Sequence, residues 1–204
     1  MLTLHQWRRK DILQKEIMPK ISVIIPIYNV APYIPQCLNS IQKQTLRDIE
    51  IFLINDGSTD DGIRICEKYA QKDERIKIIH KKNEGLSAAR NDGIAASTSP
   101  FILFVDADDW VEPEFCEVPY RIAIENKADL VFFGYNVMDG EGSIKQMKIN
   151  MKAGLLSERQ AFWFNIHYTP AVWLGLYRRE LFDEVQYPVG KIYEEVGTTH
   201  RLMF

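Results

Sequence analysis

The chain has 204 residues, of which 46% are hydrophobic and 26% are charged, and its formal net charge is −3. These values are typical of a globular domain with one sizeable core, and the slightly acidic balance argues against nucleic acid as a partner. The three cysteines are widely spaced and form no CxxC pair. This pattern argues against a disulfide framework or a zinc site and favours reduced thiols in the cytoplasm.

Residues 1–19 are predicted to be an N-terminal extension. They lack the long apolar core of a signal peptide, and no run in the chain approaches the ~20 apolar residues needed to cross a bilayer. Leu2, Leu4 and Trp7 are mixed with basic residues, which predicts a weakly amphipathic helix. Two interpretations stay open: a solvated or packing helix, or a peripheral contact with a partner or with the inner face of the membrane.

From residue 21 onwards, strand patterns alternate with helix patterns. Strands are predicted at 21–28, 49–54, 75–80, 100–106 and 128–137. Helices are predicted at 31–44, 63–73, 86–97, at 113–127 with an interruption at Pro119, and at 157–166, and the final "THRLMF" also looks helical. The alternation predicts an α/β fold with a doubly wound, mostly parallel sheet and helices on both faces.

The first loop after a strand has the sequence "PIYNVAPY" (26–33) and contains no glycine. The Rossmann fingerprint and the P-loop both need glycines here, because their backbone must approach a phosphate closely. An NAD enzyme or a P-loop NTPase is therefore excluded as the leading interpretation. A diphosphate bound at this sheet would need a metal ion instead.

Three carboxylates follow the fourth predicted strand: Asp106, Asp108 and Asp109. Residues i and i+2 of an extended chain point the same way, so Asp106 and Asp108 can converge on one cation. Two carboxylates plus substrate phosphates suit Mg²⁺ or Mn²⁺. The alternative is a solvated turn in which Asp109 or Glu112 caps the next helix.

Other polar residues follow the second and third predicted strands. Asp56 could accept the imide N–H of a uracil ring, or could form an Asx turn or a helix cap. After the third strand come Asn83, Gly85 and Arg90, where Gly85 allows close approach of a ligand and Arg90 could pair with a phosphate. The alternative there is a glycine turn beside a surface arginine.

Taken in order, six segments resemble one family. They are "ISVIIPIYNVAPYIPQCLNSIQKQT", "IEIFLINDGSTDDG", "IKIIHKKNEGLSAARNDGI", "PFILFVDADDWVEP", "AVWLGLYRRELF" and "YPVGKIYEEVGTTHRL". The family is that of the family 2 glycosyltransferases, in particular the bacterial capsule, exopolysaccharide and cell-wall members. The resemblance covers residues 20–204, which would form one GT-A catalytic domain, truncated at its C-terminus if the chain is a fragment.

The resemblance implies a nucleotide-sugar donor (often a UDP-sugar), Mn²⁺ or Mg²⁺, and inversion during transfer to a hydroxyl of a glycan or lipid-linked acceptor. By the same resemblance, the nucleoside pocket would be lined by Pro26, Tyr28 and Asp56. The base and diphosphate would be enclosed by Asn83, Gly85 and Arg90. Asp106 would lie near the ribose and, with Asp108, would form the metal-binding DxD.

Two departures from the family pattern affect the expected chemistry. The late Glu-Asp-Glu motif is Glu194, Glu195 and Val196 here, so Glu195 would be the catalytic base, with a side chain one methylene longer, and Glu194 is its neighbour. The family's Trp-Asn-Lys-Leu-Tyr is "WLGLY" (173–177), which removes a polar and a cationic side chain. From composition alone, "YEEVGTT" could also be an exposed acidic helix start.

Three other classes of function stay open. A degenerate glycosyltransferase would bind a nucleotide sugar without turnover. A sugar nucleotidylyltransferase would need a Gly-rich loop after the first strand, which is absent. A structural or interaction protein would leave the strand-end aspartates without a shared ligand.

Overall fold

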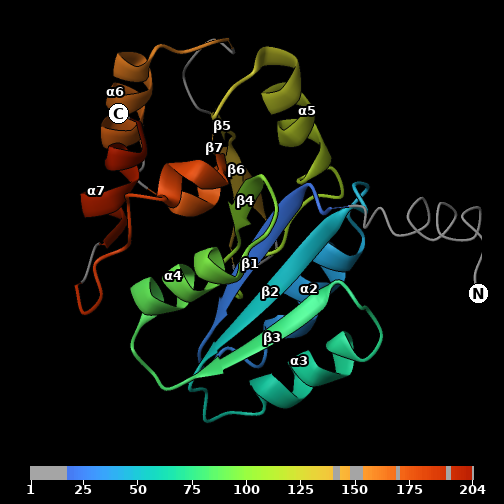
Figure 1. Cartoon of the computed structure of the whole chain (residues 1–204). Helices are drawn as coiled ribbons and strands as arrows, with labels where there is room; N and C mark the ends of the chain where they lie inside the picture. The colour runs from blue at the N-terminus through green and yellow to red at the C-terminus, as the bar shows by residue number, and fades with distance from the viewer. Residues whose placement is uncertain (1–17, 140–142, 148–153, 169–170, 192–193, 204) are drawn as a thin grey trace, which may run out of the picture.

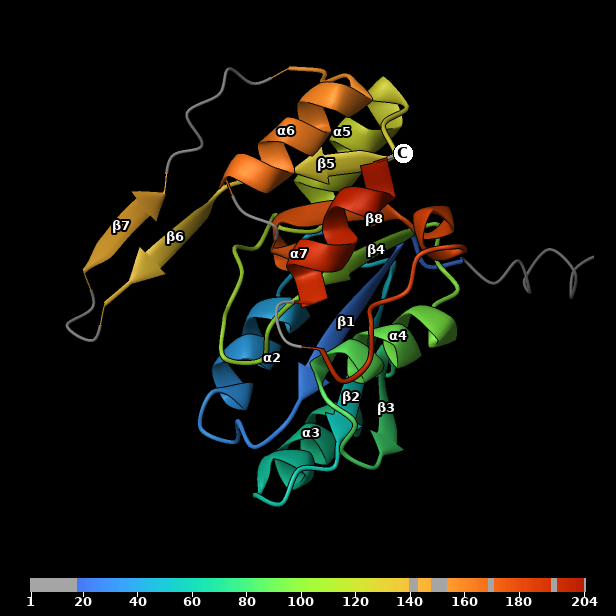
Figure 2. The ribbon, with the colours of Figure 1, turned by 90° about the vertical axis from the view of Figure 1, so that its left-hand side faces the viewer.

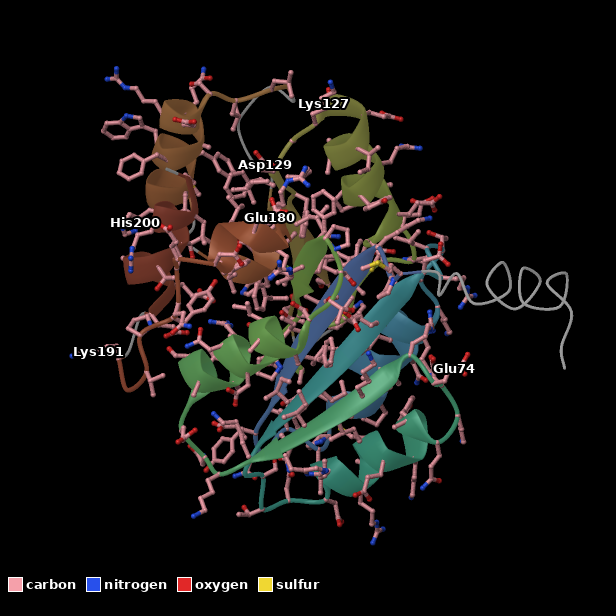
Figure 3. All side chains as sticks on the ribbon, in the orientation of Figure 1. Glu74, Lys127, Asp129, Glu180, Lys191 and His200 are labelled. Carbon is pink, nitrogen blue, oxygen red and sulfur yellow. The ribbon has the colours of Figure 1, made fainter. Side chains whose placement is uncertain are left out.

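The computed structural model describes residues 18–139, 143–147, 154–168, 171–191 and 194–203. Most of the predicted N-terminal extension therefore lies outside the described residues. Side chains such as Glu74, Lys127 and Lys191 point outward around the folded domain (Figure 3).

The centre of the molecule is a six-stranded sheet in the order β3-β2-β1-β4-β8-β5 (Figure 1). Its strands are β1 (Ile21–Ile27), β2 (Ile49–Asp56), β3 (Ile76–Lys81), β4 (Phe101–Phe104), β5 (Leu130–Phe132) and β8 (Gly175–Arg178). The first four are parallel, whereas β8 runs antiparallel to both β4 and β5. The predicted mostly parallel α/β sheet is confirmed, and it is mixed because of β8.

Helices cover both faces of this sheet. The α-helices are α2 (Ile34–Gln42), α3 (Gly62–Ala70), α4 (Leu86–Ala96), α5 (Glu117–Asn126), α6 (Glu158–Tyr168) and α7 (Glu194–Thr198), and the 3-10 helices are η1 (Val172–Leu174), η2 (Arg179–Phe182) and η3 (Thr199–Met203). Buried residues of α2, α3 and α5 form one core cluster with the odd-numbered residues of β1, such as Val23 and Ile25. Ile24 belongs to a second cluster with α4, η1, η2 and η3. This alternation is why β1 is apolar at nearly every position.

The close packing of α4 on β1 depends on Gly93. A Cβ atom at this position would lie 2.4 Å from Cγ2 of Ile24. The helix therefore approaches the strand more closely than a side chain at position 93 would permit. This contact fixes the distance between α4 and the sheet, and α4 carries Arg90 at its centre.

Two sequence predictions differ from the structure in detail, and one strand was not predicted. The strand predicted at 128–137 is two strands, because the chain leaves the main sheet after β5 and forms β6 (Tyr135–Met138), which pairs with β7 (Ile144–Met147) in a separate hairpin (Figure 2). Pro119 does not interrupt a helix: α5 begins at Glu117, so Pro119 lies in its first turn, where no backbone N–H is needed. The apolar segment 171–183 supplies β8, whose position between β4 and β5 the strand pattern did not predict.

The cysteines Cys37, Cys66 and Cys116 are buried and free. Among the described helices, none is both long and apolar enough to span a bilayer.

Candidate active site

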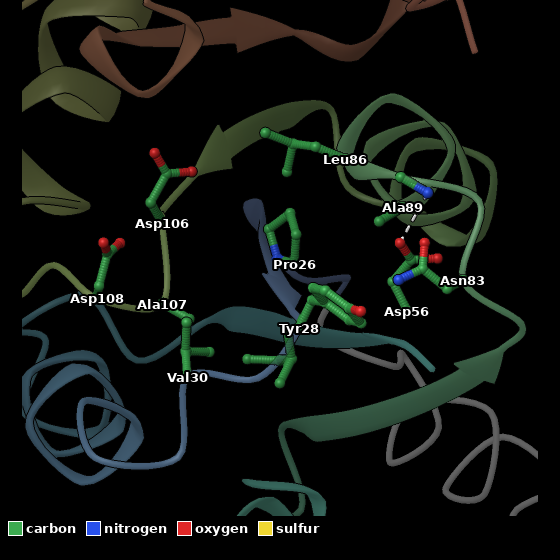
Figure 4. Close-up of a pocket in the computed structure, with 12 residues that line it drawn as sticks. Pro26, Tyr28, Val30, Asp56, Asn83, Leu86, Ala89, Asp106, Ala107 and Asp108 are labelled. Atoms are coloured by element: carbon green, nitrogen blue, oxygen red, sulfur yellow. Dashed lines mark hydrogen bonds between the residues drawn. The ribbon is translucent and has the colours of Figure 1, made fainter. Parts of the chain in front are cut away.

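A cleft of about 380 Å³ opens at the carboxyl ends of the parallel strands (Figure 4). It is lined by Pro26, Ile27, Tyr28, Val30, Asp56, Asn83, Gly85, Leu86, Ala89, Asp106, Ala107 and Asp108. Asp56 and Asn83 lie at one end of the cleft, Asp106 and Asp108 lie at the other, and Pro26 and Tyr28 lie between them (Figure 4). Residues that follow four different strands therefore meet at one cavity, as ligand sites of open α/β sheets do.

Asp56 closes one end of the cleft. Its two carboxylate oxygens accept hydrogen bonds from the backbone N–H groups of Glu84 and Gly85, at 2.9 and 2.8 Å, and Lys81 Nζ lies 3.9 Å away. The side chain is neither a local Asx turn nor a cap of α3. It holds the loop between β3 and α4 in place, and each oxygen keeps a lone pair for a further donor.

Two glycines allow this arrangement of loops. Gly57 has a φ of +71°, and a Cβ there would lie 2.8 Å from the backbone nitrogen of Asn83. Gly85 has a φ of +90° and directly precedes α4. Both positions need the left-handed region that glycine occupies without strain, and together they place Asn83 beside Asp56 in the cleft.

The glycine-free loop after β1 is joined to the loop after β2 by one side chain from each loop. Asn29 Oδ1 accepts the backbone N–H of Thr59 at 2.8 Å, and Asp60 Oδ2 accepts the backbone N–H of Ala31 at 2.8 Å. Tyr28, which the first loop presents to the cleft, is half exposed. Where other nucleotide-binding folds have a glycine-rich phosphate loop, this chain has a loop fixed by hydrogen bonds, and that loop presents an aromatic side chain to the cleft.

Asp106 and Asp108 both line the opposite end of the cleft, as predicted. Burial raises the pKa of Asp106, although the nearby charge of Arg90 opposes the rise. Asp108 is exposed, and its carboxylate accepts no hydrogen bond from the described part of the chain. The capping alternative does not fit, because α5 begins at Glu117 and its N-cap residue, Cys116, makes no side-chain cap.

The third carboxylate of this cluster, Asp109, does not line the cleft. Its backbone N–H donates to the carbonyl of Asp106 at 3.0 Å, which closes the turn. Burial, together with the charges of Asp106 and Asp108, raises its pKa to about 6. Asp106 and Asp108 therefore line the cleft, whereas Asp109 closes the turn beside it, and the metal-binding roles of the first two stay a prediction.

The residues at this end fit a divalent cation that is shared with a substrate. No group of three or more histidine, cysteine or acidic residues with metal-binding geometry exists among the described residues. Asp106 and Asp108 supply hard oxygen ligands on one wall of the cleft, and the uncommitted carboxylate of Asp108 is open to the cavity. Mg²⁺ and Mn²⁺ characteristically take one or two protein carboxylates and complete their shell with water and phosphate oxygens.

Arg90 lies outside the cleft lining, at the centre of an acidic cluster. Its guanidinium contacts Glu194 Oε1 and Glu195 Oε1 at 2.8 Å each, and Asp106 Oδ1 at 3.4 Å. The Arg90 side chain is only 1% exposed. Contact of Arg90 with a diphosphate stays a prediction, because the fork of the guanidinium is directed to protein carboxylates.

Glu194 and Glu195 begin α7 but do not form a solvated helix start. Their side chains are 13% and 20% exposed, and both are ion-paired with Arg90. Burial raises the pKa of Glu195, and Arg90 limits that rise. The predicted base thus shares the Nη2 nitrogen of Arg90 with Asp106, a proximity that no contiguous sequence motif could establish.

Sequence reasoning gave no role to Asn91 or Tyr187, which stand beside this cluster. The Tyr187 ring lies 5.7 Å from the Arg90 guanidinium, and its backbone pairs with the Asn91 side chain. Both residues belong to sequence segments that carry the family resemblance. Their membership of these segments is the signal from which a role could have been inferred.

With this geometry established, comparisons with known proteins identify the family. The model of "Glycosyl transferase family 2" matches residues 22–186. "Glycosyltransferase GlyA" of Streptococcus pneumoniae serotype 4 is 34% identical over 187 residues, which is 86% of this chain and 27% of GlyA. The chain belongs to glycosyl transferase family 2.

Solved structures agree with this assignment. S. aureus TarS 1–349 in complex with UDP-GlcNAc superimposes with a TM-score of 0.78 at 26% identity, over 90% of this chain and 53% of that chain. The mannosyltransferase PcManGT of Pyrobaculum calidifontis, in complex with GDP-Man and Mn²⁺, has a TM-score of 0.61 at 20% identity, over 91% of this chain and 54% of that chain, and shows the same fold. The predicted GT-A fold is confirmed, and the chain spans about half of the TarS chain and about a quarter of GlyA.

Proposed function

We propose that this protein transfers a sugar from a UDP-sugar to a hydroxyl of a glycan or lipid-linked acceptor, with inversion and with a divalent metal. One observation carries the proposal: a single cleft has a polar and aromatic end at Asp56 and Tyr28, and a two-carboxylate end at Asp106 and Asp108. A nucleoside diphosphate is complementary to this arrangement, because it has a planar base at one end and phosphate oxygens at the other.

The nucleoside end supports a uracil base. Tyr28 is half exposed beside Pro26, so a planar base can lie against apolar surface. An ionised Asp56 only accepts hydrogen bonds, and the imide N–H of uracil is a donor. The existence of TarS complexes with UDP and UDP-GlcNAc supports the same class of donor.

At the other end, Asp108 and Asp106 would hold Mn²⁺ or Mg²⁺. When bound, such an ion neutralises negative charge on the leaving diphosphate. The protein's own contribution is to fix Asp106 through Arg90 while Asp108 stays accessible.

Glu195 is the proposed base. The acceptor oxygen attacks the anomeric carbon, the bond from that carbon to the diphosphate oxygen breaks, UDP leaves, and the hydroxyl proton passes to Glu195. A carboxylate whose pKa is raised by burial is better matched to this work near neutral pH than an exposed one. A single displacement of this kind inverts the anomeric centre, and Glu194 is the alternative base if the motif is shifted by one residue.

The test combines binding with turnover. Calorimetry with UDP and Mn²⁺ should show binding, and a UDP-release assay over several UDP-sugars should identify one that is turned over. Glu195→Gln should reduce transfer and leave UDP affinity unchanged, with Glu194→Gln as the matched variant one residue away. If Glu194→Gln abolishes transfer and Glu195→Gln does not, the assignment of the base is wrong.

A second function is favoured by the ion pair between Arg90 and Glu195. A carboxylate engaged at 2.8 Å by a guanidinium is a weaker proton acceptor, which is compatible with a nucleotide-sugar binding module without catalysis. UDP binding with no release from any donor, in the presence of acceptor extracts, would support this module instead.

The three buried free thiols support placing the protein in the reducing cytoplasm. Peripheral contact of residues 1–19 with the membrane is part of the proposal, and flotation with anionic vesicles tests it by comparing the full chain with a chain lacking those residues.

A further inference from the structure

The side chain of Asn91 on α4 pairs with the backbone of Tyr187 through both of its polar atoms. Asn91 Nδ2 donates to the carbonyl of Tyr187 at 2.8 Å, and the N–H of Tyr187 donates to Asn91 Oδ1 at 2.9 Å. The backbone donor and acceptor of one residue are thus both satisfied by one carboxamide. The residues lie 96 positions apart in the sequence, so this pair joins α4 to the segment that leads to α7.

Tyr187 is a fixed point for that segment. It is 1% exposed, and its ring packs against Phe104 and Phe182 with centroids 6.2 and 6.4 Å apart. Phe104 is the last residue of β4, two positions before Asp106. The Tyr187 ring also covers the guanidinium of Arg90.

Arg90, which precedes Asn91 in α4, binds the other end of the same segment. It forms the ion pairs with Glu194 and Glu195 at 2.8 Å. Two consecutive helix residues therefore hold both ends of one segment: Asn91 holds the backbone at Tyr187, and Arg90 holds the carboxylates at the start of α7. Gly93 lies one helical turn away from Arg90 and allows α4 to pack close to β1. It thereby determines how far from the sheet Arg90 and Asn91 lie.

We propose that Asn91 is a positioning residue for Glu195, acting through the backbone of Tyr187. This inference rests on the proposed role of Glu195 as base. Asn91 does not line the cleft, so its loss should leave nucleotide binding intact. It should instead allow the segment that carries Glu195 to shift, and a displacement of about 1 Å at a reacting group can reduce turnover about a hundredfold.

The first experiment measures transfer and binding for Asn91→Ala and Asn91→Asp. The aspartate keeps the size of the side chain but loses the N–H donor and places a carboxylate against the Tyr187 carbonyl. Each variant should lower kcat by about ten- to a hundredfold, with the donor KM and the calorimetric Kd of UDP within about twofold of wild type. Asn126→Ala is the matched control, because it removes an exposed asparagine that bonds only within α5.

The second experiment separates positioning from a general loss of structure. If Asn91 acts through Glu195, adding Asn91→Ala to Glu195→Gln should not lower residual transfer further, since the base is already absent. An equal fold-loss in both backgrounds, or a parallel loss of UDP affinity, overturns the proposal. Should Asn91→Ala fail to fold, the same cycle is measured with Asn91→Asp.

The third readout does not depend on activity. Hydrogen exchange of the Tyr187 amide should be slow in the wild type and much faster in Asn91→Ala, while amides of β1 and β2 are unchanged. If wild type turns over no donor, the proposed function fails, and this measurement still decides whether Asn91 fixes the segment. Unchanged exchange at Tyr187 refutes that contact.

Discussion

Replacing Glu50 by glutamine should destabilise the protein without changing its ligand site. Glu50 lies in β2 at the amino end of the sheet, opposite the cleft, and its side chain is 4% exposed. Its carboxylate accepts hydrogen bonds from Ser22 Oγ at 2.6 Å, from Lys77 Nζ at 2.8 Å, and from the backbone N–H and hydroxyl of Thr98 at 2.8 and 2.9 Å. One ionised group therefore joins three strands to the turn that precedes β4.

The size of the effect follows from the pKa of this carboxyl. Burial alone would raise that pKa, but the donors from Lys77, Ser22 and Thr98 outweigh burial and lower it from 4.5 to about 2. At 1.36 kcal/mol per unit, this shift corresponds to about 3 kcal/mol of stability at neutral pH. Because the folded-state pKa is depressed, the contribution is fully present above pH 4.5 and is lost as the pH falls toward 2.

Urea unfolding of wild type and Glu50→Gln at pH 7 should therefore differ by about 3 kcal/mol, and the difference should narrow when both are measured near pH 3. Asp48→Asn is the matched control, since Asp48 pairs with Lys20 on the surface and such pairs contribute below about 1 kcal/mol. The Kd of UDP should be the same for all three proteins. A stability difference that stays constant between pH 7 and pH 3 would refute the account of Glu50 as an ionised anchor.

Four further substitutions test the site and the packing that supports it. Gly93→Ala should lower the melting temperature by the equivalent of about 1–3 kcal/mol, because its Cβ would lie 2.4 Å from Ile24; an unchanged melting temperature would contradict the close packing of α4. Arg90→Met should cost about 3–5 kcal/mol in urea unfolding, since it leaves three carboxylates without their cation; a neutral effect would show that the ion pairs are not formed in solution. Asp56→Asn should weaken UDP about tenfold by calorimetry, because one charged acceptor worth about 1–3 kcal/mol is lost, and full affinity would remove Asp56 from the base site. Asp108→Ala should abolish the Mn²⁺ dependence of UDP binding and transfer, and turnover equal to wild type would refute the metal assignment.

The strands and the cleft could be predicted because their signals are local. β1 and β2 are continuous apolar runs, which is what a strand covered on both faces requires. Asp106 and Asp108 follow such a run directly, and alternation along an extended chain brings their side chains to one side. The position of Asp56 at the other end of the same cleft follows from the rule that parallel strands end at a common edge.

The contacts around Arg90 could not be predicted in this way. Arg90 and Glu194 are 104 positions apart, and no periodicity links a mid-helix arginine to a glutamate after an irregular segment. For the same reason β8 escaped prediction: its insertion between β4 and β5 is decided by tertiary pairing, since its four residues carry no turn or alternation signal of their own. The sequence therefore suggests a phosphate partner for Arg90 but does not reveal that its guanidinium also pairs with three protein carboxylates.

This pairing explains how a buried strand can end in a cluster of negative charge. Like charges close together raise one another's pKa values, and burial adds to the cost. Arg90 provides a compensating cation for Asp106 from outside the cleft, while Asp108 projects into the cleft without a protein partner among the described residues. The two aspartates thus differ: Asp106 is fixed by an ion pair within the protein, whereas the carboxylate of Asp108 is available to a ligand. Because the same guanidinium also pairs with Glu194 and Glu195, the proposed metal-binding end of the cleft and the proposed base share one support on α4.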